Sequence, residues 1–264
     1  MTVDEINYLK EKASLGDKSS SLSLVDFYIS EKNYQKAFEL LSRLEIKNDK
    51  EIYRKLGYFY EFGLGVPVST QNAKKYYQKA YELEDVAASY NLALIYYREE
   101  DYISSIPYLS FAVSEHHVGA IKLLSELYLK GLGVEKNKDI AINLLTILLK
   151  DGDTSIYDQI GRIYYQNQEF ELAVEYFKKG VNSYDPQAMY HLAICFSKGE
   201  GVVQNISEAI RYYELAANLN HLPSIYNLAM HYQKGIGVKP DENKANVLLD
   251  KYNFLKNIKS NTQK

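Results

Sequence analysis

Pairs of glycines separated by one residue are the feature of this sequence most suggestive of chemistry. A glycine-rich loop can cradle a phosphate when it follows a strand, has the spacing G-x-x-x-x-G-K-[ST] or G-x-G-x-x-G, and opens a helix. The four copies, EFGLGVPVST, KGLGVEKN, KGEGVVQN and KGIGVKPD, have neither that spacing nor a preceding strand pattern. We therefore predict structural turns, with the first glycine of each pair ending a helix in the left-handed conformation. The eight glycines are Gly63, Gly65, Gly131, Gly133, Gly199, Gly201, Gly235 and Gly237.

The other residue types that could do chemistry are sparse. The chain has five histidines and one cysteine, with no HExxH spacing and no nucleophile elbow G-x-S-x-G. His116, His117 and His221 fall between expected helices, where we expect solvated side chains. Cys195 lies inside an apolar helical pattern, so we expect a buried, unreactive thiol. These patterns predict a protein that is not an enzyme and has no cofactor or metal site.

Composition excludes several classes of partner. The 264 residues are 46% hydrophobic and 25% charged, with a formal net charge of −3, and no basic cluster suggests nucleic-acid binding. No apolar run reaches the roughly 18 residues that span a bilayer. The N-terminal MTVDEINYLKEK is too charged for a secretory signal. We expect a cytoplasmic protein that binds neither nucleic acid nor membrane.

An internal repeat explains why the glycine pairs recur. Seven aromatic residues, which we call the anchor aromatics, each close one copy of the same pattern: Tyr28, Tyr60, Tyr96, Tyr128, Tyr164, Phe196 and Tyr232. The gaps between them are 32, 36, 32, 36, 32 and 36 residues, so two units make a period of 68. The longer units contain the glycine loop, and the seventh, expected to be short, is long.

Each unit has the pattern of two packed helices. Apolar residues precede the anchor at helical spacing and include a small residue, as in Leu56-Gly57, that lets another helix approach closely. The following helix repeats a small–large–small spacing, as in Ala73, Tyr77 and Ala80. No sustained alternation of apolar and polar residues indicates a strand. The sequence therefore predicts an all-α fold.

The repeated sequence resembles the Sel-one-like repeats, relatives of the tetratricopeptide repeat. The resemblance rests on copies such as YRKLGYFYEFGLGVPVSTQNAKKYYQKAYELED from Tyr53, although the usual Trp-Tyr pair is Tyr-Tyr here. It implies a right-handed superhelix (solenoid) of about seven helix-turn-helix repeats, with the first helices lining the concave face. We expect one solenoid over residues 1–264, with a capping helix at 3–15, repeats at 16–258 and a polar tail at 259–264.

In such a superhelix, residues two and six positions before each anchor are expected to face the groove. These positions are rich in tyrosine and arginine, which are enriched at interface cores. The predicted partner-binding residues from these two rows are Arg54, Tyr58, Tyr90, Lys122, Arg162, Tyr190 and Tyr226.

Three polar residues follow groove tyrosines and have two possible roles. Asn91, His191 and Asn227 lie in SYNLAL, MYHLAI and IYNLAM. They could hydrogen-bond the extended backbone of a partner, as an asparagine does in related repeats. They could equally tie neighbouring helices together. We include them among the predicted partner-binding residues and leave both roles open.

The resemblance implies a scaffold or adaptor that binds a protein or peptide partner in its concave groove. An alternative is a bacterial immunity protein that neutralises a cognate toxin by direct binding. A third class, a hydrolase, would require a pocket with a perturbed acid–base pair.

Overall fold

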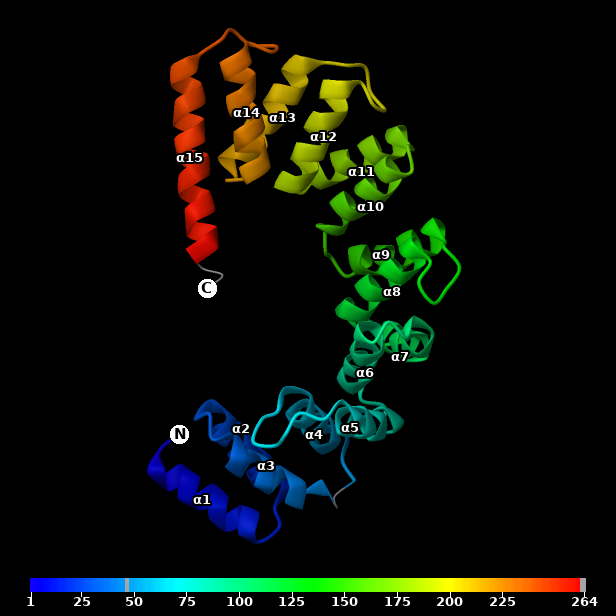
Figure 1. The fold of residues 1–264 in the computed structure, drawn as a ribbon, viewed down its shortest axis with the longest axis vertical. Coiled ribbons are helices and arrows are strands. Elements are labelled where there is room, and N and C mark those ends of the chain that lie inside the picture. Colours follow the sequence, from blue (N-terminus) through cyan, green and yellow to red (C-terminus); the bar gives the residue numbers. More distant parts are fainter. Residues whose placement is uncertain (46–47, 262–264) are drawn as a thin grey trace. The chain divides into compact units, whose positions relative to one another are not determined.

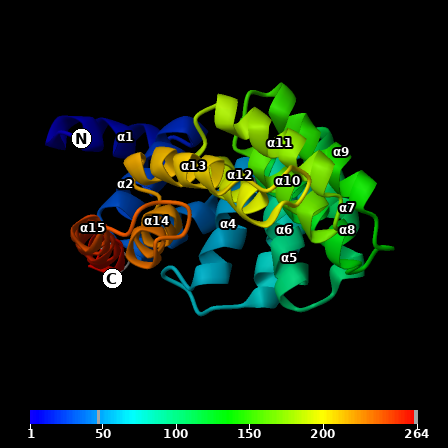
Figure 2. The same ribbon diagram turned by 90° about the horizontal axis from the view of Figure 1, so that it is seen from above.

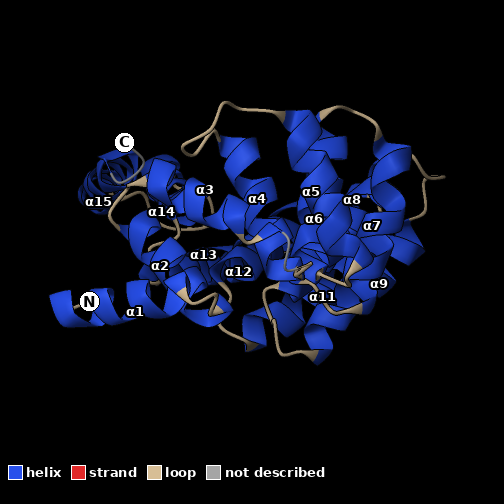
Figure 3. Cartoon of the chain, turned by 90° about the horizontal axis from the view of Figure 1, so that it is seen from below, coloured by secondary structure: helices blue, strands red, loops and turns tan. Residues whose placement is uncertain are grey.

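The computed structural model describes residues 1–45 and 48–261, and within them the regular structure consists of fifteen α-helices without a strand (Figure 3). The predicted all-α fold is confirmed. The predicted cap corresponds to α1, whereas the last three residues of the predicted tail, 262–264, lie outside the described residues. No helix in the described ranges is long and apolar enough to cross a membrane.

The helices fall into two compact units, Met1–Leu144 and Leu145–Lys264 (Figures 1 and 2). The first contains α1 (Val3–Ser14), α2 (Lys18–Ser30), α3 (Tyr34–Arg43), α4 (Lys50–Phe62), α5 (Thr70–Glu82), α6 (Val86–Arg98), α7 (Tyr102–Ser114) and α8 (Val118–Lys130). The second contains α10 (Ile156–Gln166), α11 (Phe170–Asn182), α12 (Pro186–Lys198), α13 (Ile206–Asn218), α14 (Leu222–Lys234) and α15 (Glu242–Asn261). The boundary between the units falls inside α9 (Lys138–Lys150).

The helices after α1 form successive pairs, and one backbone hydrogen bond recurs in both short and long pairs. In short pairs the N–H five residues after the anchor donates to the anchor carbonyl, as from Asp101 to Tyr96 at 3.0 Å. In long pairs the N–H nine residues after the anchor makes the same bond, as from Ser69 to Tyr60 at 2.9 Å. The glycine loop therefore inserts four residues between two groups that stay bonded.

Four anchor aromatics, Tyr60, Tyr96, Tyr164 and Phe196, pack on an aromatic side chain of the second helix in their own pair. Tyr60 stacks on Tyr76 with ring centroids 5.5 Å apart, and Tyr96 stacks on Tyr108 at 5.7 Å. A small residue one turn before the anchor makes room for the neighbouring tyrosine of the second helix, because a methyl group at Gly57 would lie 2.6 Å from the ring of Tyr77. The predicted close approach of the two helices is confirmed at this position.

The eight paired glycines all have positive φ, between 66° and 74°. Gly63 ends α4 in the left-handed conformation, with its N–H donating to the Phe59 carbonyl. A side chain at Gly65 would collide with the backbone of Tyr34, only 2.5 Å away. The valine that follows each pair packs against a core cluster, as Val66 does. These observations fit turns that close the end of a helix.

Candidate functional site

A hollow of about 570 Å³ in the second unit brings together four of the predicted partner-binding residues. It lies over α10, α12 and α14, of which α10 and α12 lie side by side (Figures 1 and 2). The predicted residues at the hollow are Arg162, Tyr190, His191 and Asn227. The hollow is also lined by Tyr165, Gln166, Ile194, Ser197, Lys198 and Tyr213.

Tyr190 lies at the centre of an aromatic cluster under the hollow. Its ring centroid is 5.2 Å from that of His191, 6.0 Å from Tyr213 and 5.1 Å from His221. Burial raises the pKa of Tyr213, and a side-chain interaction with Asn227 partly opposes this rise. The cluster gives the hollow a rigid floor that combines ring surface with hydroxyl groups.

A buried carboxylate positions the arginine of the site. Asp158 on α10 has a side chain only 6% exposed, and its Oδ2 lies 3.0 Å from Arg162 Nε. Its Oδ1 lies 2.6 Å from His191 Nδ1 on α12. Because an ionised carboxylate can only accept, we assign the hydrogen to His191 Nδ1. The ion pair engages the Nε edge of the guanidinium, and 49% of the Arg162 side chain stays exposed.

A second cation stands at the other side of the hollow. Lys198, at the end of α12, donates to the hydroxyl of Tyr165 at 2.9 Å. That hydroxyl donates to the carboxylate of Glu200, which also lies 3.6 Å from the Lys198 ammonium. Lys198 is about half exposed, as Arg162 is. The hollow therefore has two supported cations beside an aromatic floor.

Histidine, cysteine and carboxylate side chains are the groups that catalysis or metal binding would use. His221 and Ser224 are joined by a hydrogen bond of 2.8 Å, and both side chains are buried. Among the described residues, no group of three or more His, Cys, Asp or Glu could hold a metal ion. Cys195 is fully buried, as predicted, and burial raises the pKa of its thiol to about 12, so its lack of reactivity stays a prediction.

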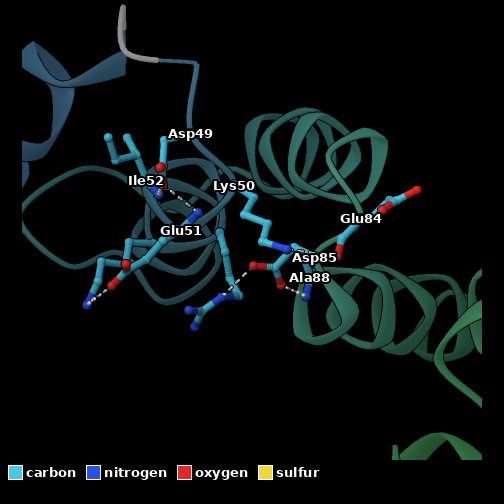
Figure 4. A network of polar contacts seen from close by, with 9 residues as sticks. Asp49, Lys50, Glu51, Ile52, Glu84, Asp85 and Ala88 are labelled. Atoms are coloured by element: carbon cyan, nitrogen blue, oxygen red, sulfur yellow. Dashed lines mark hydrogen bonds and ion pairs between the residues drawn. The ribbon is translucent and has the colours of Figure 1, made fainter. Parts of the chain in front are cut away.

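In the first unit, Arg54 has a defined partner in the next repeat. Its Nε lies 3.1 Å from Oδ2 of Asp85, and Asp85 Oδ1 accepts from the backbone N–H of Ala88 and so caps α6. Figure 4 shows this contact between the start of α6 and α4, together with the bond from Lys50 to the Glu84 carbonyl. Arg54 thus joins one first helix to the cap of the next.

Tyr90 has a similar position one repeat later. Its ring centroid lies 4.4 Å from that of His117, whose Nδ1 accepts from the N–H of Ala120 and caps α8. Tyr90 also covers Gly119, where a methyl group would lie 2.7 Å from the tyrosine ring. In the same unit, Asn91 interacts with the hydroxyl of Tyr77. The contacts of Tyr90 and Asn91 connect neighbouring helices.

The remaining predicted residues lie outside the hollow. Tyr58 is exposed and packs against Phe62 at 4.6 Å between centroids. Tyr226 is also exposed and packs against Tyr252 at 5.5 Å. Lys122 lies on α8 and is partly buried.

The structure corrects the expectation for two histidines and adds residues to the site that were not predicted. The expectation of solvated histidines is wrong for His117 and His221, because both lie at helix N-termini with their rings against tyrosine rings, and His221 is only 7% exposed. Tyr165, Gln166 and Lys198 were not predicted, since they lie just after the anchors. If the predicted groove face is extended by one helical turn beyond each anchor, it includes all three residues.

Family models match most of the chain. The Sel1 repeat model matches residues 28–44, 53–85, 118–153, 186–221 and 222–251, and a tetratricopeptide repeat model matches residues 154–185. No curated protein matches the chain.

Solved structures share the fold. A Sel1 repeat protein from Oxalobacter formigenes is 24% identical with a TM-score of 0.63, over 88% of this chain and 96% of that one. The protective antigen c5321 of uropathogenic Escherichia coli, which has an SLR fold, is 22% identical with a TM-score of 0.68, over 93% of this chain and 55% of that one. The C-terminal part of a TPR repeat-containing protein from Cytophaga hutchinsonii is 17% identical with a TM-score of 0.62, over 87% and 93%. With most of its repeats matched by one family model, the chain belongs to the Sel1 repeat family.

Proposed function

We propose that this protein is a non-enzymatic interaction scaffold and that the hollow over α10, α12 and α14 binds a segment of a protein partner. The observation that carries this proposal is the position of Arg162, held by buried Asp158 beside the ring of Tyr190. Tyrosine and arginine are the residue types that dominate interface energies. A side chain already fixed in place loses little freedom on binding, which favours affinity.

The chemistry of the hollow indicates how the partner is held. An apolar side chain of the partner can cover Ile194 and the ring of Tyr190, while Arg162 and Lys198 attract an acidic side chain. Gln166 and Asn227 supply amide groups for the backbone of an extended segment. Arg54 and Tyr90 are assigned a structural role in this proposal, because they contact the caps of neighbouring helices.

The test compares a site variant with a matched control in affinity capture from native lysate, followed by titration of each captured protein. The site variant carries Arg162→Gln and Tyr190→Ser, and the control carries Arg211→Gln and Tyr184→Ser, which change an exposed arginine and an exposed tyrosine outside the hollow. We expect a partner that binds wild type and control and loses at least tenfold in affinity for the folded site variant. Equal binding to all three proteins would move the interface elsewhere.

Neutralisation of a cognate toxin is a narrower form of the same activity. No contact in the hollow favours a toxin over another protein, so this alternative stays a prediction.

A further inference from the structure

A second hollow, at the start of the first unit, has a different chemistry. It measures about 560 Å³ and lies among α1, α2 and α3, which pack together in Figure 1. Its apolar wall consists of Ala13, Leu24, Leu40 and Leu44, beside the ring of Tyr28. Leu24 and Leu44 are buried, so the wall belongs to the interior of this helix group. The volume is in the range of sites for small molecules.

Three cations stand around this hollow without a matching set of acids. Lys10 comes from α1, and Lys36 and Arg43 come from α3. The acidic side chain in the lining, Glu39, accepts from the amide of Gln35 at 3.3 Å. Three positive charges and one negative charge leave a surplus of two positive charges.

The cations at this hollow lack the ion pairs that some other cations of the first unit form. Lys18 pairs with Asp49 at 2.6 Å, and Lys55 pairs with Asp26. Within residues 1–45 and 48–261, by contrast, Lys10, Lys36 and Arg43 have no carboxylate within ion-pair distance. Lys36 lies over the ring of Tyr28, with its ammonium 6.0 Å from the ring centroid.

An anion in the hollow would meet three positive side chains beside an apolar wall. Near a protein surface, contact between opposite charges is favourable before desolvation is counted. The apolar wall adds a favourable contact for a hydrocarbon or aromatic body. A cation or an uncharged polar molecule would gain neither contribution.

We propose that this hollow binds a small amphiphilic anion, whose carboxylate or phosphate contacts Lys36, Arg43 and Lys10 while its apolar body lies against Leu24, Leu40 and Leu44. This site is separate from the hollow over α10, α12 and α14, and it goes beyond the proposed scaffold function. It would make the protein a receptor for a small molecule as well as for a protein partner.

The test uses the full chain and the fluorescent probe 8-anilinonaphthalene-1-sulfonate, an anion with an apolar aromatic body. We expect saturable binding of one probe per chain and at least a tenfold loss of affinity in the double variant Lys36→Gln/Arg43→Gln. The control variant Lys178→Gln/Lys239→Gln removes two exposed charges elsewhere and should bind as wild type does. Equal weakening in both variants, loss of binding in Arg162→Gln, or no saturable binding would overturn the proposal.

Competition identifies the head group. Octanoate and octyl phosphate share one apolar body, and the one that displaces the probe at lower concentration carries the preferred anion. Octanol has the same body without charge and should displace the probe at least tenfold less well than both. Displacement by octanol at equal concentration would show that charge has no role and would overturn the proposal. Matching melting temperatures of the variants would exclude misfolding as the cause of lost binding.

Discussion

His191 Nδ1 lies 2.6 Å from Asp158 Oδ1, and this hydrogen bond joins the first helices of two consecutive repeats. The same carboxylate holds Arg162, so one buried side chain fixes two of the polar groups that line the hollow. In Asp158→Asn the charge is lost, and we expect the free energy of unfolding to fall by about 1–3 kcal/mol. This estimate is below the usual range for a buried ion pair because Arg162 is half exposed. Urea unfolding measures the change.

A matched substitution at an exposed aspartate distinguishes the effect of losing the buried carboxylate from the effect of losing any surface charge. Asp26 pairs with Lys55 and has a side chain 58% exposed, so Asp26→Asn should change stability by less than about 0.5 kcal/mol. If the two variants lose equal stability, the buried pair does not have the organising role that we assign to it.

His221 should make stability depend on pH between about 4 and 6.5. The pKa of its imidazole is lowered to about 4 in the folded protein, chiefly by burial, with smaller lowering contributions from His191 and Lys259 that Asp158 opposes. As pH falls below the unfolded value of about 6.5, the unfolded chain binds a proton that the folded chain does not, so stability decreases. The loss at pH 4 relative to pH 7 approaches about 3 kcal/mol.

Urea unfolding at several pH values, for wild type and for His221→Asn, measures this contribution. Asparagine can occupy the same helix N-terminus without titrating. We expect a shallower decline of stability with acid in the variant, and an unchanged slope would contradict a buried neutral histidine.

Tyr184 is a site where glycine should stabilise the fold. It has φ 59° and lies between α11 and α12, with its side chain 78% exposed. The left-handed conformation is unfavourable for a residue with a Cβ by about 1–2 kcal/mol, part of which the greater freedom of unfolded glycine offsets. Tyr184→Gly should raise the free energy of unfolding by up to about 1 kcal/mol. The check is to compare the thermal unfolding of Tyr184→Gly with that of Tyr184→Ala, which keeps the backbone strain. Equal stability of the two variants would refute the explanation.

Cys195 should react with a thiol reagent only when the chain opens. Its side chain is fully buried, and its raised pKa keeps it protonated at neutral pH. The rate of reaction with 5,5′-dithiobis(2-nitrobenzoic acid) should rise with urea in parallel with unfolding. Fast reaction in native buffer would show that α12 opens locally.

The fold was predictable because the same packing contact recurs. Each anchor aromatic that packs on its partner helix, as Tyr60 does on Tyr76, marks the sequence at a fixed spacing. A four-residue loop changes that spacing without changing the contact. The all-α repeat fold was therefore predictable from this spacing.

The site was only partly predictable, because position on a helix does not determine the neighbour. Arg54 and Tyr190 occupy equivalent positions, six residues before their anchors. Arg54 meets an aspartate at the next helix start and forms an ion pair. Tyr190 meets a histidine and also lines a hollow. The difference depends on side chains more than 25 residues away, which a local pattern does not contain.

The contact between the first helix of one repeat and the start of the first helix of the next repeat limits how repeats can be deleted or exchanged. An arginine at this position faces an aspartate, as in Arg54 and Asp85, and a tyrosine faces a histidine, as in Tyr90 and His117. Tyr190 and His221 repeat the second pairing. Deleting the repeat that contains Asp85 and Tyr90 would place Arg54 beside His117. Recombination at this point therefore preserves the contact only when both members of the pair move together.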